Sequence, residues 1–438
     1  MNMQLLIYTP ENTPRLKYTF ALFFEHIISV PYRITNDNEE YANWQGPKLN
    51  YSSGITEKDP FSINPSGLLF QSGISPQKIS ISEWNGLKIF FPSASGNLPF
   101  DIFSAAFYLV SRYEEYFDRP LDCHARFQAV SSLAYQNQFL EQPLVNFWAM
   151  QLKKELLKQY PMLAFKEAVY TYTPTIDIDV AYAHLGRTAA VTAGGYLRML
   201  LKLNTKGILE KTAVLLGTKQ DPYDTYSYQE AVIKKYKLSP IYFFLASSIR
   251  SHYDRNINPG GKTFAALVKK ANGFAQIGIH PSYQSASRAD VVKSEVANVE
   301  RCLTYKITKS RQHFLRVRLP ETYRCLAELN ITDDYSLAYA QAPGFRASIC
   351  TPFPFYDLRA EKTLPVIIHP PAVMDGTLNE YMNMSPGDAE KAIERIIAQV
   401  KYCRGEFISI WHNHSLSERD NWENWKEVFE NMVKWAAS

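Results

Sequence analysis

The amino-acid sequence predicts an α/β protein whose C-terminal part, residues 170–438, contains a parallel sheet, either open or closed into a barrel. Strand-like and helix-like segments alternate after residue 170, and strict β-α alternation requires parallel strands. At 438 residues, the chain is also too long for one ordinary core. Residues 1–165 are therefore expected to form a second, smaller α/β or α+β domain.

The N-terminal part mixes short strands and helices. A strand is expected at 3–8 and a helix at 14–28, followed by a polar, turn-rich stretch at 35–76. Residues 79–82 and 87–91 flank Asn85-Gly86, which is typical of a β-hairpin turn. Two further helices are expected at 100–117 and 144–157. This part offers no pattern that indicates chemistry.

The C-terminal part contains about seven candidate strands. They are expected at 173–180, 241–246, 275–279, 314–317, 340–346, 365–368 and 407–411. Candidate helices between and after them are 262–272, 290–305, 320–329, 387–402 and 422–436. In parallel α/β folds the chemistry lies at the carboxyl ends of the strands, so polar residues there are the candidates for a site.

Asp177 and Asp179 are the clearest sign of chemistry in the chain. They lie two residues apart at the end of a β-branched run, so their side chains are expected to share one face of a strand. Two like charges in a mostly buried place are costly unless a cation or a proton relieves them. The pair predicts a metal site or a carboxylate with a raised pKa. A structural pair bound to loop amides is the alternative.

Other polar residues fall within or after the predicted strands, namely His280, Arg316, Arg346, His412 and His414. Because strand ends share one rim, their coincidence predicts a single site. Asp and His suit a divalent metal such as zinc, and a catalytic site keeps one position open for water. A second carboxylate would accept the proton of that water, a histidine opposite would protonate the leaving nitrogen, and an arginine would keep the base ionised.

These motifs resemble those of the metal-dependent polysaccharide deacetylases, the NodB-homology or carbohydrate esterase 4-like group. The similar stretches are Thr175-Ile176-Asp177-Ile178-Asp179, His280-Pro281-Ser282, the run from Arg311 to Arg316, and Ile410-Trp411-His412-Asn413. Residues 344–348 and 354–357 resemble a Bacteroidetes branch with an extra N-terminal domain. The resemblance covers roughly residues 170–420. It implies a distorted, seven-stranded (β/α) barrel that removes acetyl groups from a saccharide.

The resemblance also implies a role for each site residue. Asp177 is the base and His412 the acid, with Arg316 and Arg346 as further catalytic residues. Asp179 and His280 hold the metal, which is expected to be zinc. The group normally has a second histidine four residues after the first, where this chain has Gln284. Gln284, a poor zinc ligand, completes the predicted set, and the alternatives are Ser282, Ser285, His184, His369 or a water.

Structural roles remain open for several of these residues. His280 could cap the turn at Pro281-Ser282, and Arg346 could pair with Asp357. Histidines are more often packed or exposed than metal-bound, so ordinary roles are expected for three others and exposure to solvent for His414. The three are His184, His313 and His369.

Composition limits the partners. The net charge of +4 does not imply nucleic acid, and five scattered cysteines without a CxxC pair indicate reduced thiols. No apolar stretch approaches the roughly 20 residues of a membrane span, and no secretory signal is evident, so a cytoplasmic location is expected. The basic, leucine-rich segment 187–217 is interpreted as a lid or packing helix pair. Contact with a membrane, suited to a lipid-linked saccharide, is its alternative interpretation.

Three functions follow from these patterns. The first is hydrolytic deacetylation of a saccharide, on nitrogen or oxygen. The second is a carbohydrate-binding protein on a decayed deacetylase fold, which Gln284 favours. The third is a metal-dependent glycosyltransferase, because Asp-x-Asp also occurs there. It ranks last because the first 165 residues show no glycine-rich phosphate loop.

Overall fold

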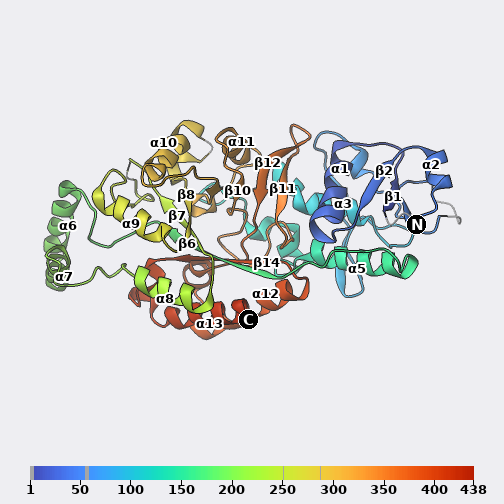
Figure 1. The fold of residues 1–438 in the computed structure, drawn as a ribbon. Coiled ribbons are helices and arrows are strands. Elements are labelled where there is room, and N and C mark those ends of the chain that lie inside the picture. Colours follow the sequence, from blue (N-terminus) through green and yellow to red (C-terminus); the bar gives the residue numbers. More distant parts are fainter. Residues whose placement is uncertain (1–3, 55–58, 250, 287) are drawn as a thin grey trace.

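A computed structural model of the chain describes residues 4–54, 59–249, 251–286 and 288–438. Met3, expected to begin the first strand, and residues 55–58 of the turn-rich stretch lie outside the described residues. A small parallel sheet lies toward one end of the molecule, and a larger, mostly parallel sheet occupies its middle (Figure 1). The smaller one belongs to the N-terminal part and the larger one to the C-terminal part.

The N-terminal part is built around a three-stranded parallel sheet. β1 (Leu5–Tyr8) lies between β2 (Tyr32–Thr35) and β3 (Lys48–Asn50). The side chain of Thr13 accepts a hydrogen bond from the backbone of Leu16, and Pro14 occupies the first helical turn. This is a favourable start for a helix. The other elements are α1 (Pro14–Ala21) with a π-helical continuation (Leu22–Ile27), α2 (Asn38–Asn43), the hairpin β4 (Ser82–Trp84) and β5 (Leu87–Ile89), α3 (Ile102–Val110), α4 (Leu133–Gln136) and α5 (Leu144–Gln159).

The C-terminal part is built around a sheet of nine strands in the described residues, rather than seven. They are β6 (Thr171–Ile178), β7 (Ile241–Leu245), β8 (Gln276–His280), β9 (Lys309–Ser310), β10 (Asp333–Asp334), β11 (Phe353–Asp357), β12 (Lys362–Ile368), β13 (Val373–Met374) and β14 (Glu406–His412). Their order is β11-β12-β10-β9-β8-β7-β6-β14-β13. All neighbours are parallel except β11 and β12. The parallel core places the ends of β6, β8 and β14 on one rim.

Two predicted strands are wrong. Residues 314–317 form a 3-10 turn and its exit, and Phe314 and Leu315 have φ angles of 59° and 53°, which no strand contains. Residues 340–346 form a buried loop. Both segments are apolar because they pack inside the protein, and a short apolar run does not distinguish a buried strand from a buried loop.

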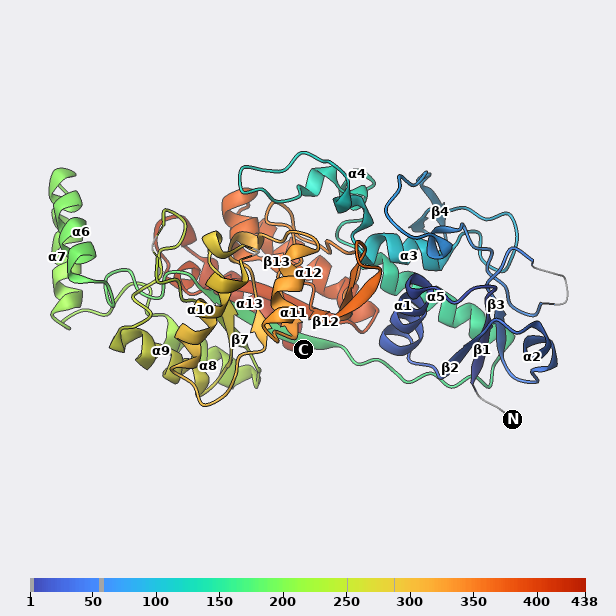
Figure 2. The ribbon, with the colours of Figure 1, turned by 90° about the horizontal axis from the view of Figure 1, so that it is seen from above.

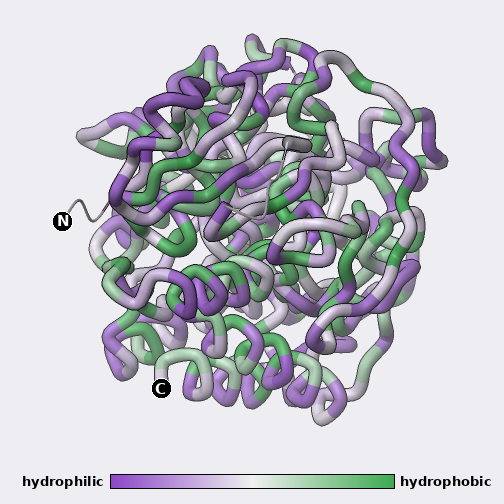
Figure 3. The backbone as a smooth tube through the Cα atoms, turned by 90° about the vertical axis from the view of Figure 1, so that its right-hand side faces the viewer, coloured by the Kyte–Doolittle hydropathy of each residue, from purple (hydrophilic) through white to green (hydrophobic). Residues whose placement is uncertain are grey.

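Helices flank the larger sheet. α8, α12 and α13 lie below the strands and α10 and α11 above them in Figure 1. Hydrophobic and hydrophilic turns alternate along the helices near the C-terminus (Figure 3), as expected for helices that bury one face. The helix bounds are α8 (Tyr226–Tyr236), α9 (Lys262–Asn272), α10 (Ala289–Glu300), α11 (Glu321–Glu328), α12 (Pro386–Tyr402) and α13 (Trp425–Ala437).

α6 (Ala189–Leu201) and α7 (Thr205–Leu215) form a helical hairpin between β6 and α8. The hairpin projects from the end of the molecule that is farthest from the N-terminal sheet (Figures 1 and 2). It departs from the compact arrangement of the other helices. Among the described residues, no helix combines the length and the apolar character needed to span a membrane.

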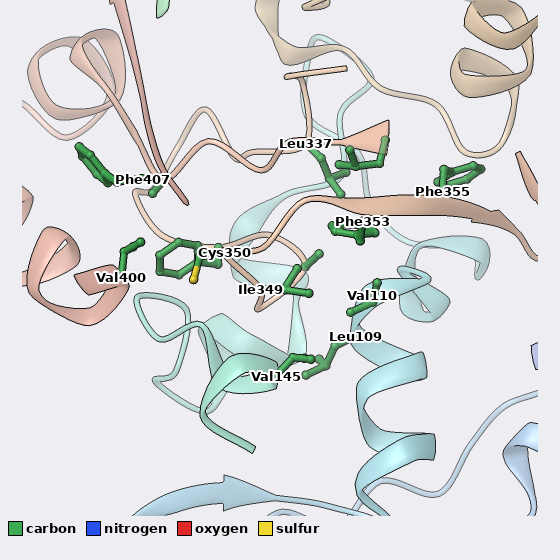
Figure 4. Packing of buried hydrophobic residues seen from close by; sticks show 14 of the residues in the cluster. Leu109, Val110, Val145, Leu337, Ile349, Cys350, Phe353, Phe355, Val400 and Phe407 are labelled. Atoms are coloured by element: carbon green, nitrogen blue, oxygen red, sulfur yellow. The ribbon is translucent and has the colours of Figure 1, made fainter. Parts of the chain in front are cut away.

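The two parts of the chain share one hydrophobic core. Leu109 and Val145 of the N-terminal part pack near Ile349 and Phe353 of the C-terminal part (Figure 4). An ion pair of 2.5 Å between Arg15 and Glu361 also joins the two parts. Because this contact is both apolar and charged, the N-terminal part is packed firmly against the larger sheet.

Candidate metal and catalytic site

Asp177 and Asp179 lie at the end of β6, in the interior of the nine-stranded sheet. β6 pairs with β14 and β7, which places Asp177 opposite His412 and Phe243. Both carboxylates line a cavity of about 430 Å³. Asp177 is 3% exposed, so its charge is largely removed from water. The two acids therefore require nearby positive groups.

Two histidines converge on Asp179. Nε2 of His280, the last residue of β8, lies 3.1 Å from Oδ1 of Asp179. Nε2 of His313 lies 3.4 Å from Oδ2 of the same carboxylate. Potential ligand atoms of these three residues all lie within 4.8 Å of one another. One carboxylate and two imidazoles at this spacing form a donor set that suits a divalent metal.

The outer nitrogens of both histidines are held by the protein. Nδ1 of His280 lies within hydrogen-bond distance of the carbonyl oxygen of Arg311, and Nδ1 of His313 lies 3.0 Å from Oδ1 of Asp254. Such contacts fix the orientation of the ring and direct Nε2 toward the centre of the site. The rings are thus set for binding before any ion arrives.

The two carboxylates differ in their contacts. Among the described residues, Oδ1 of Asp177 is buried without a hydrogen-bond partner, whereas Oδ1 of Asp179 faces Nε2 of His280 at 3.1 Å. Burial alone would raise the pKa of Asp179, but His313 and His280 hold this pKa well below its usual range. Burial lowers the pKa of His313, and Asp179 and Asp254 outweigh it to give a pKa of about 9. Without a metal, a proton on His313 would balance the charge of Asp179.

His412 approaches the cavity from β14. Its Nδ1 lies 2.7 Å from Oδ1 of Asp375, and its Nε2 lies 3.5 Å from Oδ2 of Asp179. Burial lowers its pKa, but Asp375 first, then Asp179 and Asp177, raise it to about 10. Asp375 also accepts hydrogen bonds from the backbone of His412 and from Ser415. His412 is therefore an oriented, protonated imidazole at neutral pH.

Arg311 is the arginine beside Asp177. Its Nη1 lies 3.7 Å from Oδ1 of Asp177, and its Nη2 donates to Oγ1 of Thr175 at 2.7 Å. The guanidinium lies over the ring of Phe243, 4.8 Å from the ring centroid. The ring fits there because β8 has Gly278 at this position, where a Cβ would lie 2.6 Å from the ring. The fully buried Arg311 thus places a positive charge beside the Asp177 carboxylate.

Three predicted site residues lie elsewhere. Gln284 is exposed and lies outside the donor set, in which His313 is the third member. Arg316 stacks on Tyr283 and donates to the carbonyl oxygen of His124, because the predicted strand that would have aimed it inward does not form.

Arg346 lies in the buried loop and forms an ion pair of 2.5 Å with Glu115. Asp357, its predicted alternative partner, instead pairs with Arg324 at 2.6 Å. Arg346 therefore joins the N-terminal part to the C-terminal part, and does not contact the acids.

Three functional candidates were not predicted from the sequence. His313 was expected to be an ordinary packed histidine, although it lies two residues after Arg311, within the stretch that resembles the arginine-bearing motif of the deacetylases. Asp375 directly follows the two-residue strand β13, and it was missed because so short a strand leaves no periodic signal. Asp254 lies in an irregular segment after β7, where nothing in the pattern marks it. His414, expected to face solvent, is only partly exposed and lines the cavity.

The N-terminal part supplies one wall of the same cavity. His124 and Arg126 line it together with Asp177 and His412. Arg126 donates to the carbonyl oxygen of Phe314 at 2.8 Å and to the hydroxyl of Tyr381 at 3.2 Å. The cavity is therefore closed by residues from both parts of the chain.

A known protein family matches the N-terminal part of the chain. A model of a family of unknown function, DUF7033, matches residues 5–161. No curated protein matches the chain.

Several solved structures resemble the chain in part. One, from Mycobacterium smegmatis, is assigned to the polysaccharide deacetylases; it has 9% identity and a TM-score of 0.41 over 63% of this chain and 86% of that one. A CE4-family pseudoenzyme from Bacillus anthracis has 10% identity and a TM-score of 0.30, covering 61% and 60%. A polysaccharide deacetylase from Bacillus cereus has 11% identity and a TM-score of 0.28, covering 60% and 87%. At these TM-scores the likenesses assign neither a fold nor an activity to this chain.

Proposed function

We propose that the protein is a metal-dependent hydrolase that removes acetyl groups from a saccharide. The observation that carries the proposal is the convergence of Asp179, His280 and His313 with Asp177 and His412 in one cavity. The three histidines come from three different segments of the chain, while Asp177 lies in β6 and Asp179 directly follows it. Such an arrangement is costly to build from charged groups and supports a shared chemical task.

The donor set fits a divalent metal, and zinc is the proposed ion. Asp179, His280 and His313 would hold it, because potential ligand atoms of all three lie within 4.8 Å of one another. An ion held by three protein groups keeps a position for water or substrate, lowers the pKa of a water and polarises a carbonyl group. Asp254 and the carbonyl of Arg311 would support the two imidazoles from behind.

The remaining residues supply the proton transfers. Asp177, which lies beside Arg311, would accept the proton of the attacking water. His412, held as an imidazolium by Asp375, would donate a proton to the leaving nitrogen or oxygen. This is the division of roles that the sequence motifs imply.

The walls of the cavity support a saccharide as the substrate. Aromatic side chains line it beside the acids, namely Tyr253, Phe314, Tyr381 and Trp422. Aromatic faces pack against the apolar faces of sugar rings, while His124 and Arg126 offer hydrogen-bond donors. Because the cavity is bounded by both parts of the chain, the N-terminal part is proposed to contact the substrate.

The proposal is tested by measuring metal content and acetate release together. The purified protein should bind one zinc per chain and release acetate from N-acetylated oligosaccharides. Asp177→Asn should keep the metal and lower the rate by about 10²–10⁴-fold, since general-base catalysis contributes that much. An Asp177→Asn protein with full activity would show that the base is misassigned.

A carbohydrate-binding protein on a decayed fold is the second candidate. It was favoured by Gln284, but with His313 present the loss of that ligand no longer argues for decay. Saccharide binding with bound zinc and no acetate release would favour this candidate over the hydrolase.

A further inference from the structure

A second cavity adjoins the catalytic one. It measures about 600 Å³ and lies between the α6–α7 hairpin and the segment after β7. His252 and Arg255 line both cavities. A ligand that extends past these two residues can therefore occupy both spaces.

The second cavity is strongly basic. Its cationic lining residues are Arg187, Arg198, Lys202, Lys211 and Arg255, and no acidic residue lines it among the described residues. The side chains of Arg198 and Lys202 form no hydrogen bond or ion pair within the described part of the chain. Burial and then the charge of Arg187 lower the pKa of Lys211, which shows how closely the cations are gathered. Cations gathered around a cavity with no acidic lining residue favour an anionic ligand, and a phosphate matches the forked donors of arginine.

The hairpin above this cavity exposes leucines. No residue of α6 is buried, and five leucines around the turn are 58–87% exposed: Leu197, Leu200, Leu201, Leu203 and Leu209. We call them the turn leucines. A projecting turn with so much exposed apolar surface indicates an interaction site. The turn lies at the end of the molecule that is free of other elements (Figures 1 and 2).

The charge of the hairpin indicates what covers the turn leucines. Residues 187–219 contain six Lys or Arg and one Glu. A second copy of the hairpin would bring two positively charged surfaces together, which is unfavourable. A phospholipid surface with anionic headgroups instead complements both the leucines and the cations.

We propose that the substrate is a saccharide joined through a phosphate or diphosphate to a membrane lipid. The turn leucines rest in an anionic phospholipid surface, the phosphate lies in the basic cavity, and the sugar reaches the catalytic cavity past His252 and Arg255. The placement of an acetylated sugar in the catalytic cavity depends on the proposed hydrolase function. The membrane contact and the phosphate site do not depend on catalysis.

Vesicle flotation tests the membrane contact. The full-length protein should float with phosphatidylcholine vesicles that contain phosphatidylglycerol, less with phosphatidylcholine alone, and less at high salt. Leu201→Ser/Leu203→Ser should reduce binding about tenfold or more, since these side chains are 78% and 87% exposed and their loss removes only surface contacts. Met162→Ser/Val169→Ser is the matched control, with side chains 73% and 78% exposed outside the hairpin, and should bind as the wild type does.

Titration with inorganic diphosphate tests the basic cavity without lipid. The wild type should bind it saturably by calorimetry, and Arg198→Gln/Lys202→Gln should weaken binding about tenfold or more. Absence of diphosphate binding to the wild type would overturn the phosphate site. Absence of flotation, or a dimer that the leucine substitutions dissociate, would overturn the membrane contact. Acetate release from a soluble oligosaccharide distinguishes these failures from failure of the hydrolase proposal.

Discussion

Two histidines of this protein, His313 and His369, have similar nearest neighbours. They differ in the wider contacts that these neighbours make. Each is mostly buried between two carboxylates. His313 lies between Asp179 and Asp254, and His369 lies 2.9 Å from Asp333 and 3.2 Å from Glu406. The carboxylates raise the pKa of both histidines against the effect of burial. Neither burial nor a raised pKa distinguishes them.

The difference lies in what else the carboxylates face. Asp179 is approached by three histidines and lines a cavity. Asp333 and Glu406 instead accept hydrogen bonds from Thr332 and Thr173, and His369 is covered by the ring of Tyr335, 4.4 Å away. His313, the proposed metal-binding histidine, shares its acceptor Asp179 with two other histidines beside a cavity, whereas His369 completes a closed set of bonds.

The largest expected effect is on metal binding. His313→Gln should lower zinc affinity at least about 100-fold, beyond the range typical for loss of an outer contact, because it removes a ligand. His369→Gln should leave the affinity unchanged. Competition with a chromogenic chelator measures both. Equal effects of the two substitutions would erase the distinction between the histidines.

Asp254 and Asp333, the carboxylates that contact the two histidines, allow a second comparison. Asp254→Asn should lower zinc affinity about 10–100-fold, because it weakens the contact that orients His313 without removing a ligand. Asp333→Asn changes the equivalent partner of His369 and is the matched control. The same chelator competition applies, and an unaffected Asp254→Asn would indicate that His313 is oriented by packing alone.

The part of this site that lies at the ends of regular strands could be predicted from the sequence, whereas the part that lies in turns and irregular segments could not. Asp177, Asp179, His280 and His412 follow or end long strands, where a clear apolar run marks the position of the rim. The alternation of elements also predicted a parallel sheet, although β9, β10 and β13 have only two residues each and two of the candidate strands are loops.

The missed residues depend on long-range geometry. His313 enters the site because the backbone turns through left-handed angles at Phe314 and Leu315, which a strand pattern cannot express. Arg316, rather than Arg311, was predicted to be catalytic for the same reason. A strand would have directed Arg316 into the site, whereas the turn that replaces it leaves Arg311 beside Asp177. Glu115, which holds Arg346, is 231 residues away along the chain. No local pattern predicts such a pairing.

A smaller effect follows from pH. In the metal-free protein His313 has a pKa of about 9, so at neutral pH it must lose a proton before it can bind an ion. Zinc affinity should therefore rise about tenfold per pH unit between neutral pH and about 9, and level off above it. Titrations at several pH values measure the slope and the proton release. Affinity that does not change over this range would mean that His313 is not a ligand.

The smallest expected effect is on stability, and it belongs to His369. Its pKa is raised in the folded protein, so the protonated ring stabilises the fold below the ordinary value near 6.5, and this contribution is lost as pH rises through the folded-state pKa. His369→Gln should lower the free energy of unfolding by about 1–3 kcal/mol at pH 6 and by less at alkaline pH, as expected for hydrogen bonds to charged groups. Urea unfolding at both pH values measures the difference. A loss that is the same at both would show that packing on Tyr335, rather than the charge, is what His369 contributes.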